Sequence, residues 1–396
     1  MRELRVVLLG GRIFPPLRNL LADREKIGRL LLFTTPQTPN KPENFVKTLP
    51  QGLRERVVVK RGEIIDPEDY EAFIRRLKEL LERWSGPVSV DITSSPKIPA
   101  LAAWEALRQR QGTVLYSLAS SSVVVRFNFK DNEIRIAKEK MEPIRVAQYL
   151  HLYGRDVRKN FDVEQLSFSG ELEKQEAAYR VALHIIGQAS FGIKFLKFFR
   201  CFVSVKEEGG VIRANLKERK ECKKYYLKNM IELFRFLAHR GLLKLKRENP
   251  LEVEVTVNNA GFLTGKWLDF YLYMVLKESG LFYDCDYSVE IPRGEAKNEI
   301  DFIGVSKDGV VFVAEAKTGE VGRKDLDTLE ATVNLIGGNA VVKYLVAHQR
   351  EASLHPDALS SLKAQAEEHR INLLFSESLP PENLIKAFKE PKFQPI

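Results

Sequence analysis

Cysteine, histidine and long apolar runs are scarce in this sequence, and each scarcity excludes a class of protein. The three cysteines among 396 residues form no CxxC pair, so a structural zinc site of the usual spacing is not expected. The six histidines show no HxH or HExxH spacing and there is no GxxxxGK(S/T) loop, which argues against a histidine-dependent ribonuclease and an ATPase. No apolar run approaches the roughly 20 residues of a membrane span. With an odd cysteine count and no signal peptide, we expect a cytoplasmic protein without a membrane partner.

Basic residues outnumber acidic ones in an otherwise ordinary globular composition. The chain has 62 Lys and Arg against 53 Asp and Glu, a formal net charge of +9, with 44% hydrophobic and 29% charged residues. Its length corresponds to two or three domains of about 150 residues. The positive charge makes an anionic partner, nucleic acid first, the one to test.

Residues 1–145 alternate short apolar runs with helical patterns. The runs predict strands at 5–10, 29–34, 56–61, 87–93 and 113–118. A helix is predicted after the third strand, with Asp66 as N-cap and Pro67 in its first turn, and another after the fourth. A hairpin is predicted around Asp131 and Asn132. This order predicts an α/β domain, Rossmann-like, with a largely parallel sheet.

Residues 146–255 mix helical patterns with short strands and leave two interpretations open. The strands on either side of Gly209 and Gly210 predict a hairpin between two helices. The segment is either a winged-helix-like module or the beginning of the last domain. Its stretch of basic residues at 213–247 is either a surface that follows phosphates or a solvated face.

The most specific chemical pattern lies in residues 256–396. Asp301 is in one apolar strand, Glu315 and Lys317 are in the next, and a turn at Asp308 and Gly309 joins the two. Alternation places Glu315 and Lys317 on one face, and the hairpin brings Asp301 to the same face. Two carboxylates can hold Mg²⁺ or Mn²⁺, which activates water and phosphate, while a lysine stabilises developing charge. The set suits phosphodiester hydrolysis.

The alternative is a surface hairpin with a salt bridge, but charges inside the run VVFVAEAK need a reason, because desolvation is costly. Asp301 followed by Glu315-Ala316-Lys317 resembles the PD-(D/E)xK signature of restriction-endonuclease-like enzymes. The resemblance implies that Asp301 and Glu315 are metal ligands and that Lys317 is catalytic. It further implies an acidic residue from the preceding helix, for which Asp269 is the candidate. Glu299, two residues before Asp301, could share its face and the ligand role.

Two strand ends in the first domain have the composition of a ligand site. Ligands of parallel sheets bind at the carboxyl ends of strands, and helix N-termini attract phosphate. Glycines allow close approach, and an arginine can pair with phosphate. The candidates are Gly10, Gly11 and Arg12 after the first strand, and Thr93, Ser94, Ser95 and Lys97 after the fourth. The alternatives are a plain helix capped by Thr93 or Ser94, and a nicotinamide enzyme, for which a GxGxxG motif is missing.

The segment Asp91–Lys97 resembles the motif of CARF domains, with serines in place of two glycines and Pro96 in place of a threonine. The stretches at 267–269, 298–301, 315–317 and 335–338 resemble the CARF-domain ancillary nucleases of type III CRISPR systems. The resemblance implies a homodimeric sensor of cyclic oligoadenylate, cyclic tetra-adenylate first, joined to a Mn²⁺- or Mg²⁺-dependent nuclease that cuts DNA or RNA. The expected segments are 1–145 (sensor), 146–255 (mixed linker) and 256–396 (nuclease). The rival hypothesis is a nucleotide-sensing, winged-helix transcriptional regulator with a non-catalytic last domain.

Overall fold

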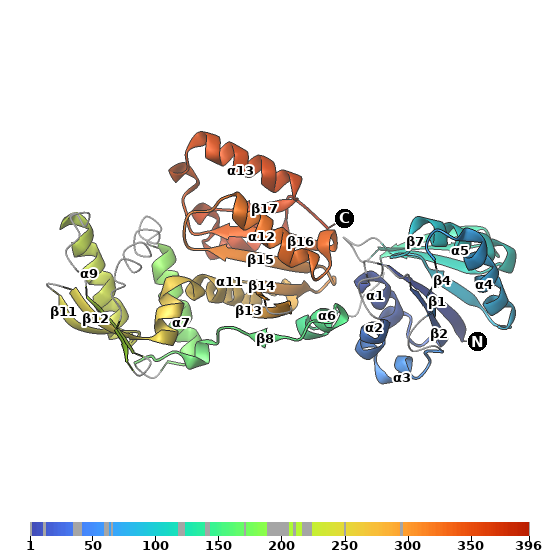
Figure 1. The fold of residues 1–396 in the computed structure, drawn as a ribbon, viewed down its shortest axis with the longest axis horizontal. Coiled ribbons are helices and arrows are strands. Elements are labelled where there is room, and N and C mark those ends of the chain that lie inside the picture. The colour runs from blue at the N-terminus through green and yellow to red at the C-terminus, as the bar shows by residue number, and fades with distance from the viewer. Residues whose placement is uncertain are drawn as a thin grey trace.

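The protein consists of three bodies in a row, whose order in space differs from their order in the chain (Figure 1). This computed structural model describes residues 2–10, 13–34, 42–58, 63–64, 66–117, 123–138, 143–169, 172–187, 206–208, 211–215, 224–248, 251–293 and 296–395. The N-terminal sheet lies at one end, the C-terminal sheet in the middle and a small sheet at the other end. Among the described helices, none combines the length and apolar character that crossing a bilayer requires.

The N-terminal sheet is doubly wound around β1 (Glu3–Leu9). Its strand order is β3-β2-β1-β4-β5-β6-β7, and the first five of these run parallel. Along β1, Val6 faces the helices α4 and α5, whereas Val7 faces α1 and α2, so both faces are covered. The predicted parallel domain is confirmed, including the antiparallel hairpin that closes it. The other elements are α1 (Phe14–Ala22), β2 (Ile27–Thr34), α2 (Pro42–Thr48), α3 (Gln51–Arg54), β3 (Glu63–Ile64), α4 (Tyr70–Glu82), β4 (Val88–Asp91), α5 (Lys97–Arg110), β5 (Thr113–Ser117), β6 (Val123–Asn128) and β7 (Glu133–Lys138).

Two local predictions in this domain need correction. Helix α4 is capped by Asp69, whose carboxylate accepts a hydrogen bond from the backbone N–H of Ala72 at 2.8 Å. Asp66 instead accepts from the N–H of Glu68 in the preceding turn. Asp69 is the better placed cap because it directly precedes the apolar residues of the helix. Of the strand predicted at 56–61, the described part shows one bridge, from Val57 to Leu30, and residues 59–61 lie outside the described residues.

The C-terminal sheet has the order β17-β16-β15-β14-β13-β8. The strands β13, β14 and β15 form an antiparallel meander, and β15, β16 and β17 run parallel. The predicted turn between β14 and β15 is confirmed, with Gly309 at a φ of +73°, a region that favours glycine. The elements are α11 (Trp267–Glu278), β13 (Phe282–Arg293), β14 (Ala296–Ser306), β15 (Val311–Lys317), α12 (Arg323–Asn334), β16 (Val341–Ala347), α13 (Pro356–Glu368), β17 (Ile371–Leu374) and α14 (Pro381–Lys389).

The middle segment connects the two ends of the row. After α6 (Val146–Leu152), the short strand β8 (Arg158–Lys159) pairs with the edge strand β13 of the C-terminal sheet. The described strands on either side of Gly209 and Gly210, β9 and β10, pair antiparallel in a four-stranded sheet of order β11-β12-β10-β9, and the predicted strand at 201–205 lies outside the described residues. The elements are α7 (Lys174–Gly187), β9 (Lys206–Glu208), β10 (Val211–Asn215), α9 (Lys224–His239), β11 (Lys244–Glu248), β12 (Leu251–Thr256) and α10 (Val257–Gly261).

Helix α1 joins the N-terminal domain to the C-terminal one. Its Phe14 ring lies edge-on to Tyr149 of α6, with ring centroids 5.1 Å apart, and the Tyr149 hydroxyl donates to the carbonyl of Ile336. One turn along α1, the buried Arg18 donates from Nη1 to the carbonyl of Gly309 at 3.2 Å. The turn between β14 and β15 is therefore anchored on the N-terminal domain.

Candidate active site

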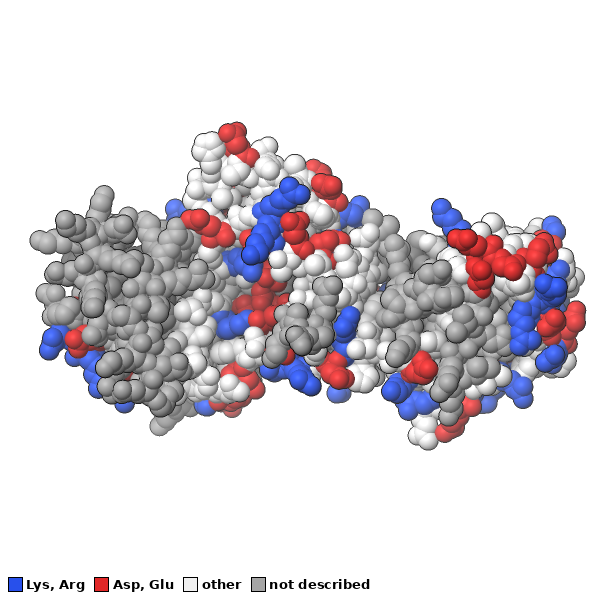
Figure 2. Space-filling view, in the orientation of Figure 1, with Lys and Arg blue, Asp and Glu red and all other residues white. Residues whose placement is uncertain are grey.

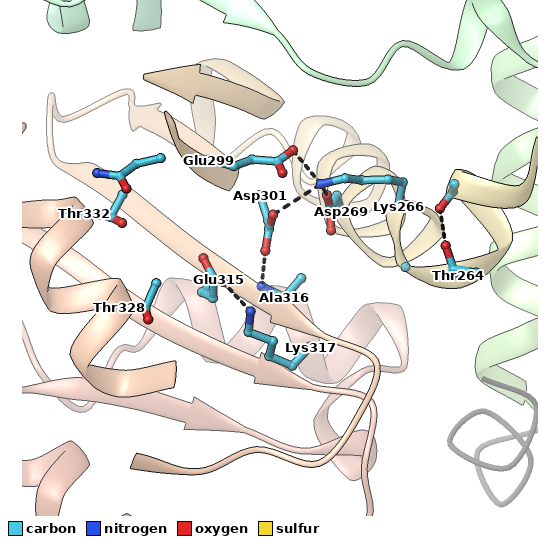
Figure 3. A pocket seen from close by; sticks show the side chains of 13 residues that line it. Thr264, Lys266, Asp269, Glu299, Asp301, Glu315, Ala316, Lys317, Thr328 and Thr332 are labelled. Atoms are coloured by element: carbon cyan, nitrogen blue, oxygen red, sulfur yellow. Dashed lines mark hydrogen bonds and ion pairs between the residues drawn. The ribbon is translucent and has the colours of Figure 1, made fainter. Parts of the chain in front are cut away.

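The β14–β15 hairpin places three of the predicted site residues together. Phe302 pairs with Ala314, so the next residues along the strands, Asp301 and Glu315, lie opposite each other on one face. Asp301 accepts a hydrogen bond at 2.7 Å from the backbone N–H of Ala316, and the Lys317 ammonium lies 2.6 Å from Glu315 (Figure 3). The side chains of Asp301 and Glu315 are each only 10% exposed, so the alternative of a surface hairpin is wrong.

Helix α11 adds a carboxylate and a lysine to the same place. The chain enters α11 through a π-helical turn, Phe262–Lys266, which kinks at Gly265. Beyond the kink, the buried Asp269 forms an ion pair of 2.9 Å with Lys266, one helical turn earlier. The Lys266 ammonium also contacts Glu299 and lies 3.7 Å from Asp301 (Figure 3).

Strand β13 contributes a serine through an unusual backbone conformation. Ser288 has a φ of +50°, a region that few residues other than glycine adopt and that is common at functional sites. Its fully buried hydroxyl bridges Asp269, at 3.1 Å, and Glu299, at 2.8 Å. The amide of Asn160, just after β8, donates to the other oxygen of Glu299 at 3.0 Å. The carboxylates of two different elements are thus held in fixed positions.

The acids and lysines of β14, β15 and the start of α11 line one open cavity of about 430 Å³, which α12 closes on another side. In the space-filling view, acidic side chains gather in a hollow at the middle of the molecule, with basic ones beside them (Figure 2). The lining residues are Gly261, Thr264, Gly265, Lys266, Asp269, Asn298, Glu299, Asp301, Glu315, Ala316, Lys317, Thr328 and Thr332.

Burial of so many acids changes their proton affinity. Desolvation, reinforced by the charge of Asp301, raises the pKa of Glu315 to about 7. Desolvation likewise raises the pKa values of Asp301 and Asp269 above the ordinary range. Burial opposes the charge of Lys266 and of Lys317, but the neighbouring carboxylates outweigh it and raise both pKa values. The site therefore binds protons readily, and an added cation would relieve the same repulsion.

The donor set fits a hard divalent cation. Asp269, Glu299 and Asp301 each offer a carboxylate oxygen within 4.8 Å of the others, and Glu315 lies across the hairpin from Asp301. Magnesium and manganese prefer such oxygen ligands. The residues that the sequence analysis selected thus converge on one acidic cavity.

Sequence reasoning missed two members of this site, Lys266 and Ser288. Lys266 lies three residues before Asp269, a spacing that puts both side chains on one side of a helix. That spacing could have identified it. Ser288 depends on a backbone conformation for which the sequence offers no signal.

The second candidate site also assembles from two strand ends. Beyond β1, the N–H of Gly10 donates to the hydroxyl of Ser94 at 3.3 Å, and that hydroxyl donates to the carbonyl of Leu8 at 2.9 Å. At the end of β4, the buried Asp91 accepts from the N–H of Thr93 and from the amide of Asn19 on α1. Gly11 and Arg12 lie outside the described residues.

Helix α5 begins at Lys97 with Pro96 as N-cap and no capping side chain, so the alternative of a helix capped by Thr93 or Ser94 is wrong. The hydroxyl of Ser95 donates to the carbonyl of Pro96, and Lys97 is exposed at the first turn. An uncapped helix start beside a lysine has the chemistry to receive a phosphate.

The architecture matches solved structures over almost the whole chain. No family model matches the sequence, and no curated protein is found as a relative. Protein VC1899 from Vibrio cholerae superposes with a TM-score of 0.69 at 15% identity, over 98% of both chains. Can2 from Sulfobacillus thermosulfidooxidans, in complex with cyclic tetra-adenylate, gives a TM-score of 0.69 at 17% identity, over 98% of this chain and 97% of that one.

The chain shares the fold of Can2. The similarity confirms the predicted α/β fold class, with a Rossmann-like, doubly wound domain at the N-terminus and a second α/β domain at the C-terminus. The resemblance that the two sequence motifs suggested therefore holds for the fold from one end of the chain to the other.

Proposed function

We propose that this protein is a divalent-metal-dependent nuclease that cyclic tetra-adenylate, or another cyclic oligoadenylate, activates in type III CRISPR antiviral defence. The observation that carries the proposal is the convergence of Asp301, Glu315 and Lys317 in one cavity, on a fold shared with a protein solved with cyclic tetra-adenylate. The proposed substrate is DNA, RNA or both. In this proposal, residues 1–145 are the sensor, 146–255 the linker and 256–396 the nuclease.

Asp301 and Glu315 are the proposed ligands of Mg²⁺ or Mn²⁺. Such an ion, when bound, polarises a phosphoryl oxygen and lowers the pKa of a water molecule. Lys317, held 2.6 Å from Glu315 at the open side of the cavity, stabilises negative charge that develops on the phosphate. Asp269 and Glu299, locked by Ser288, keep the acidic wall of the cavity in place.

The proposed activator site is the loop between β4 and α5 together with the end of β1. Gly10 lets the end of β1 pack closely against the carbonyl of Ser94, and the start of α5 supplies amides without a capping side chain and the charge of Lys97. Thr93, Ser94 and Ser95 supply hydroxyls, and Gly11 and Arg12 complete the candidate set. Helix α1 contacts both Asp91 at the end of β4, through Asn19, and the β14–β15 turn, through Arg18, so it offers a route from activator to nuclease.

A second copy of the chain is the proposed partner of an exposed apolar face beside Lys97. On this face, Trp104 of α5 packs on Phe127 of β6, and Ile134 of β7 lies opposite Phe127. Its exposed apolar members are Ile98, Leu101, Trp104, Tyr116, Ile134 and Ile136. A large exposed apolar patch next to a ligand loop is typical of a protein interface.

Breaking this face should produce monomers. We expect the double variant Leu101→Glu, Ile136→Glu, which buries two charges in the interface, to weaken self-association about 100-fold or more. Analytical ultracentrifugation measures the association. The control is Val257→Glu, an exposed apolar residue on α10 that should leave the dimer unchanged. A double variant that sediments like the wild type would reject this interface.

The deciding experiment is a cleavage assay on labelled single-stranded DNA, single-stranded RNA and supercoiled plasmid. Each substrate is incubated with Mn²⁺ or Mg²⁺, with and without cyclic tetra-adenylate, beside Glu315→Ala. Cleavage that needs metal, activator and Glu315 supports the proposal and names the substrate. Cleavage without activator would support the nuclease proposal but contradict the proposal that the N-terminal domain is an activator sensor. Tight, sequence-specific duplex binding without cleavage would favour the transcriptional regulator.

A further inference from the structure

The ammonium group of Lys266 occupies the centre of the acidic cluster. It forms ion pairs with Asp269 and Glu299 and lies 3.7 Å from Asp301, so it touches every member of the triad that could hold a cation (Figure 3). We propose that Lys266 takes the place of a second metal ion, so that the active site holds one divalent cation per chain, bound by Asp301 and Glu315. This inference rests on the proposed function, because it concerns the metal of the same site.

The triad is already supplied with donors. The carboxylate of Asp269 receives Lys266 and the Ser288 hydroxyl on the same oxygen, Oδ2. One oxygen of Glu299 likewise contacts Lys266 and shares the single Ser288 O–H with Asp269, and its other oxygen accepts from the amide of Asn160. A cation entering between these two carboxylates would have to displace bonds from three elements of the fold. Asp301 is the most distant of the three acids from Lys266, at 3.7 Å, and Glu315 contacts Lys317 instead of Lys266.

Lys266 is held in place by the backbone. It is the last residue of the π-helical turn and directly precedes α11, so its position is fixed by the kink at Gly265 and by the buried helix that follows. Its side chain is 23% exposed, whereas that of Asp269 is 4% exposed. A mostly buried lysine close to three carboxylates supplies the positive charge that a metal ion from solution would otherwise supply.

The formal charges of the cavity agree with one divalent ion. Four carboxylates and two lysines line it, a sum of −4 + 2 = −2, which a single divalent cation neutralises. Without Lys266 the sum becomes −3, and the three acids of the triad lose their common counterion. A second cation would then be attracted to the place that the ammonium leaves. The lysines are Lys266 and Lys317, and the carboxylates are Asp269, Glu299, Asp301 and Glu315.

The test counts metal ions in the full-length protein. Mn²⁺ is titrated by calorimetry, and electron paramagnetic resonance detects whether bound ions are magnetically coupled. We expect one Mn²⁺ in the wild type and in Lys266→Arg, which keeps the charge. We expect two in Lys266→Met, with the second bound about 100-fold more tightly than in the wild type and coupled to the first. A purely structural lysine would not change this count.

Two outcomes would overturn the inference: a coupled Mn²⁺ pair in the wild type, or a single Mn²⁺ in folded Lys266→Met. If Lys266→Met folds only when Mn²⁺ is added, the number of ions that remain bound after gel filtration gives the same answer. Failure of the proposed function looks different. In that case either Glu315→Gln binds as much Mn²⁺ as the wild type, or the wild type binds one Mn²⁺ but cleaves no nucleic acid.

Discussion

Replacing Glu315 with glutamine should reduce activator-dependent cleavage about 1000-fold, because an amide is a poor ligand for a hard cation and the loss amounts to about 4 kcal/mol. The side chain keeps its size, so the cavity and the hairpin should be preserved. Initial rates at saturating Mn²⁺ and activator measure the effect. The matched control is Glu382→Gln, an exposed glutamate on α14, which should cleave like the wild type.

The same variant should stabilise the metal-free protein at pH 8. The pKa of Glu315 is raised by desolvation to about 7 in the fold, so the folded state binds a proton that the unfolded state releases near pH 4.5. The metal-free fold therefore loses stability as the pH rises from about 4.5 through about 7. Glutamine removes this loss, and the melting temperature at pH 8 should rise by about 2–4 °C. Equal or lower melting temperatures, with cleavage unchanged, would contradict the role of Glu315.

The second large effect is expected from Gly10→Ala in the proposed activator site. A Cβ at Gly10 would lie 1.9 Å from the carbonyl oxygen of Ser94, a distance that no side-chain movement can relieve because the contact is with backbone. The end of β1 or the loop after β4 must therefore shift. We expect affinity for cyclic tetra-adenylate to fall about 100-fold, equivalent to about 2.7 kcal/mol.

The control for Gly10→Ala is Gly52→Ala in the same domain. A Cβ at Gly52 meets no atom within 4 Å, and Gly52 lies in helix α3, where alanine is the better helix former. Gly52→Ala should therefore bind activator normally and melt at the same temperature or slightly higher. Calorimetry with cyclic tetra-adenylate measures both variants. Normal binding by Gly10→Ala would place the activator elsewhere.

Local sequence pattern sufficed to predict which hairpin residues lie together in the candidate site. Strand alternation put Glu315 and Lys317 on one face, and the short turn at Gly309 brought Asp301 opposite, because antiparallel register follows from turn position. Asp269 required the family resemblance, since α11 approaches the hairpin only in the folded chain. The acid-to-lysine contact that completes the site, from Glu299 to Lys266, spans 33 residues of sequence, and no local rule predicts it.

The arrangement of the domains in space was harder to predict from the sequence. The short strand β8 pairs with β13, which lies about 130 residues later, and so carries the chain past the C-terminal sheet to the small sheet beyond it (Figure 1). A two-residue strand has too little periodicity to be recognised from sequence. The predicted start of α4 was three residues early, because Asp66 and Asp69 are the same residue type and either could cap a helix. Packing of the apolar face decides between such candidates.

Helix α1 touches three parts of the molecule within six residues: Phe14 meets helix α6, Arg18 meets the β14–β15 turn, and Asn19 meets Asp91 at the end of β4. A connection of this kind transmits free energy equally in both directions. If bound activator raises the affinity of the proposed nuclease domain for its substrate through α1, then bound substrate must raise the affinity of the proposed sensor for activator by the same factor. Activator would then dissociate most slowly from those protein molecules that have substrate bound.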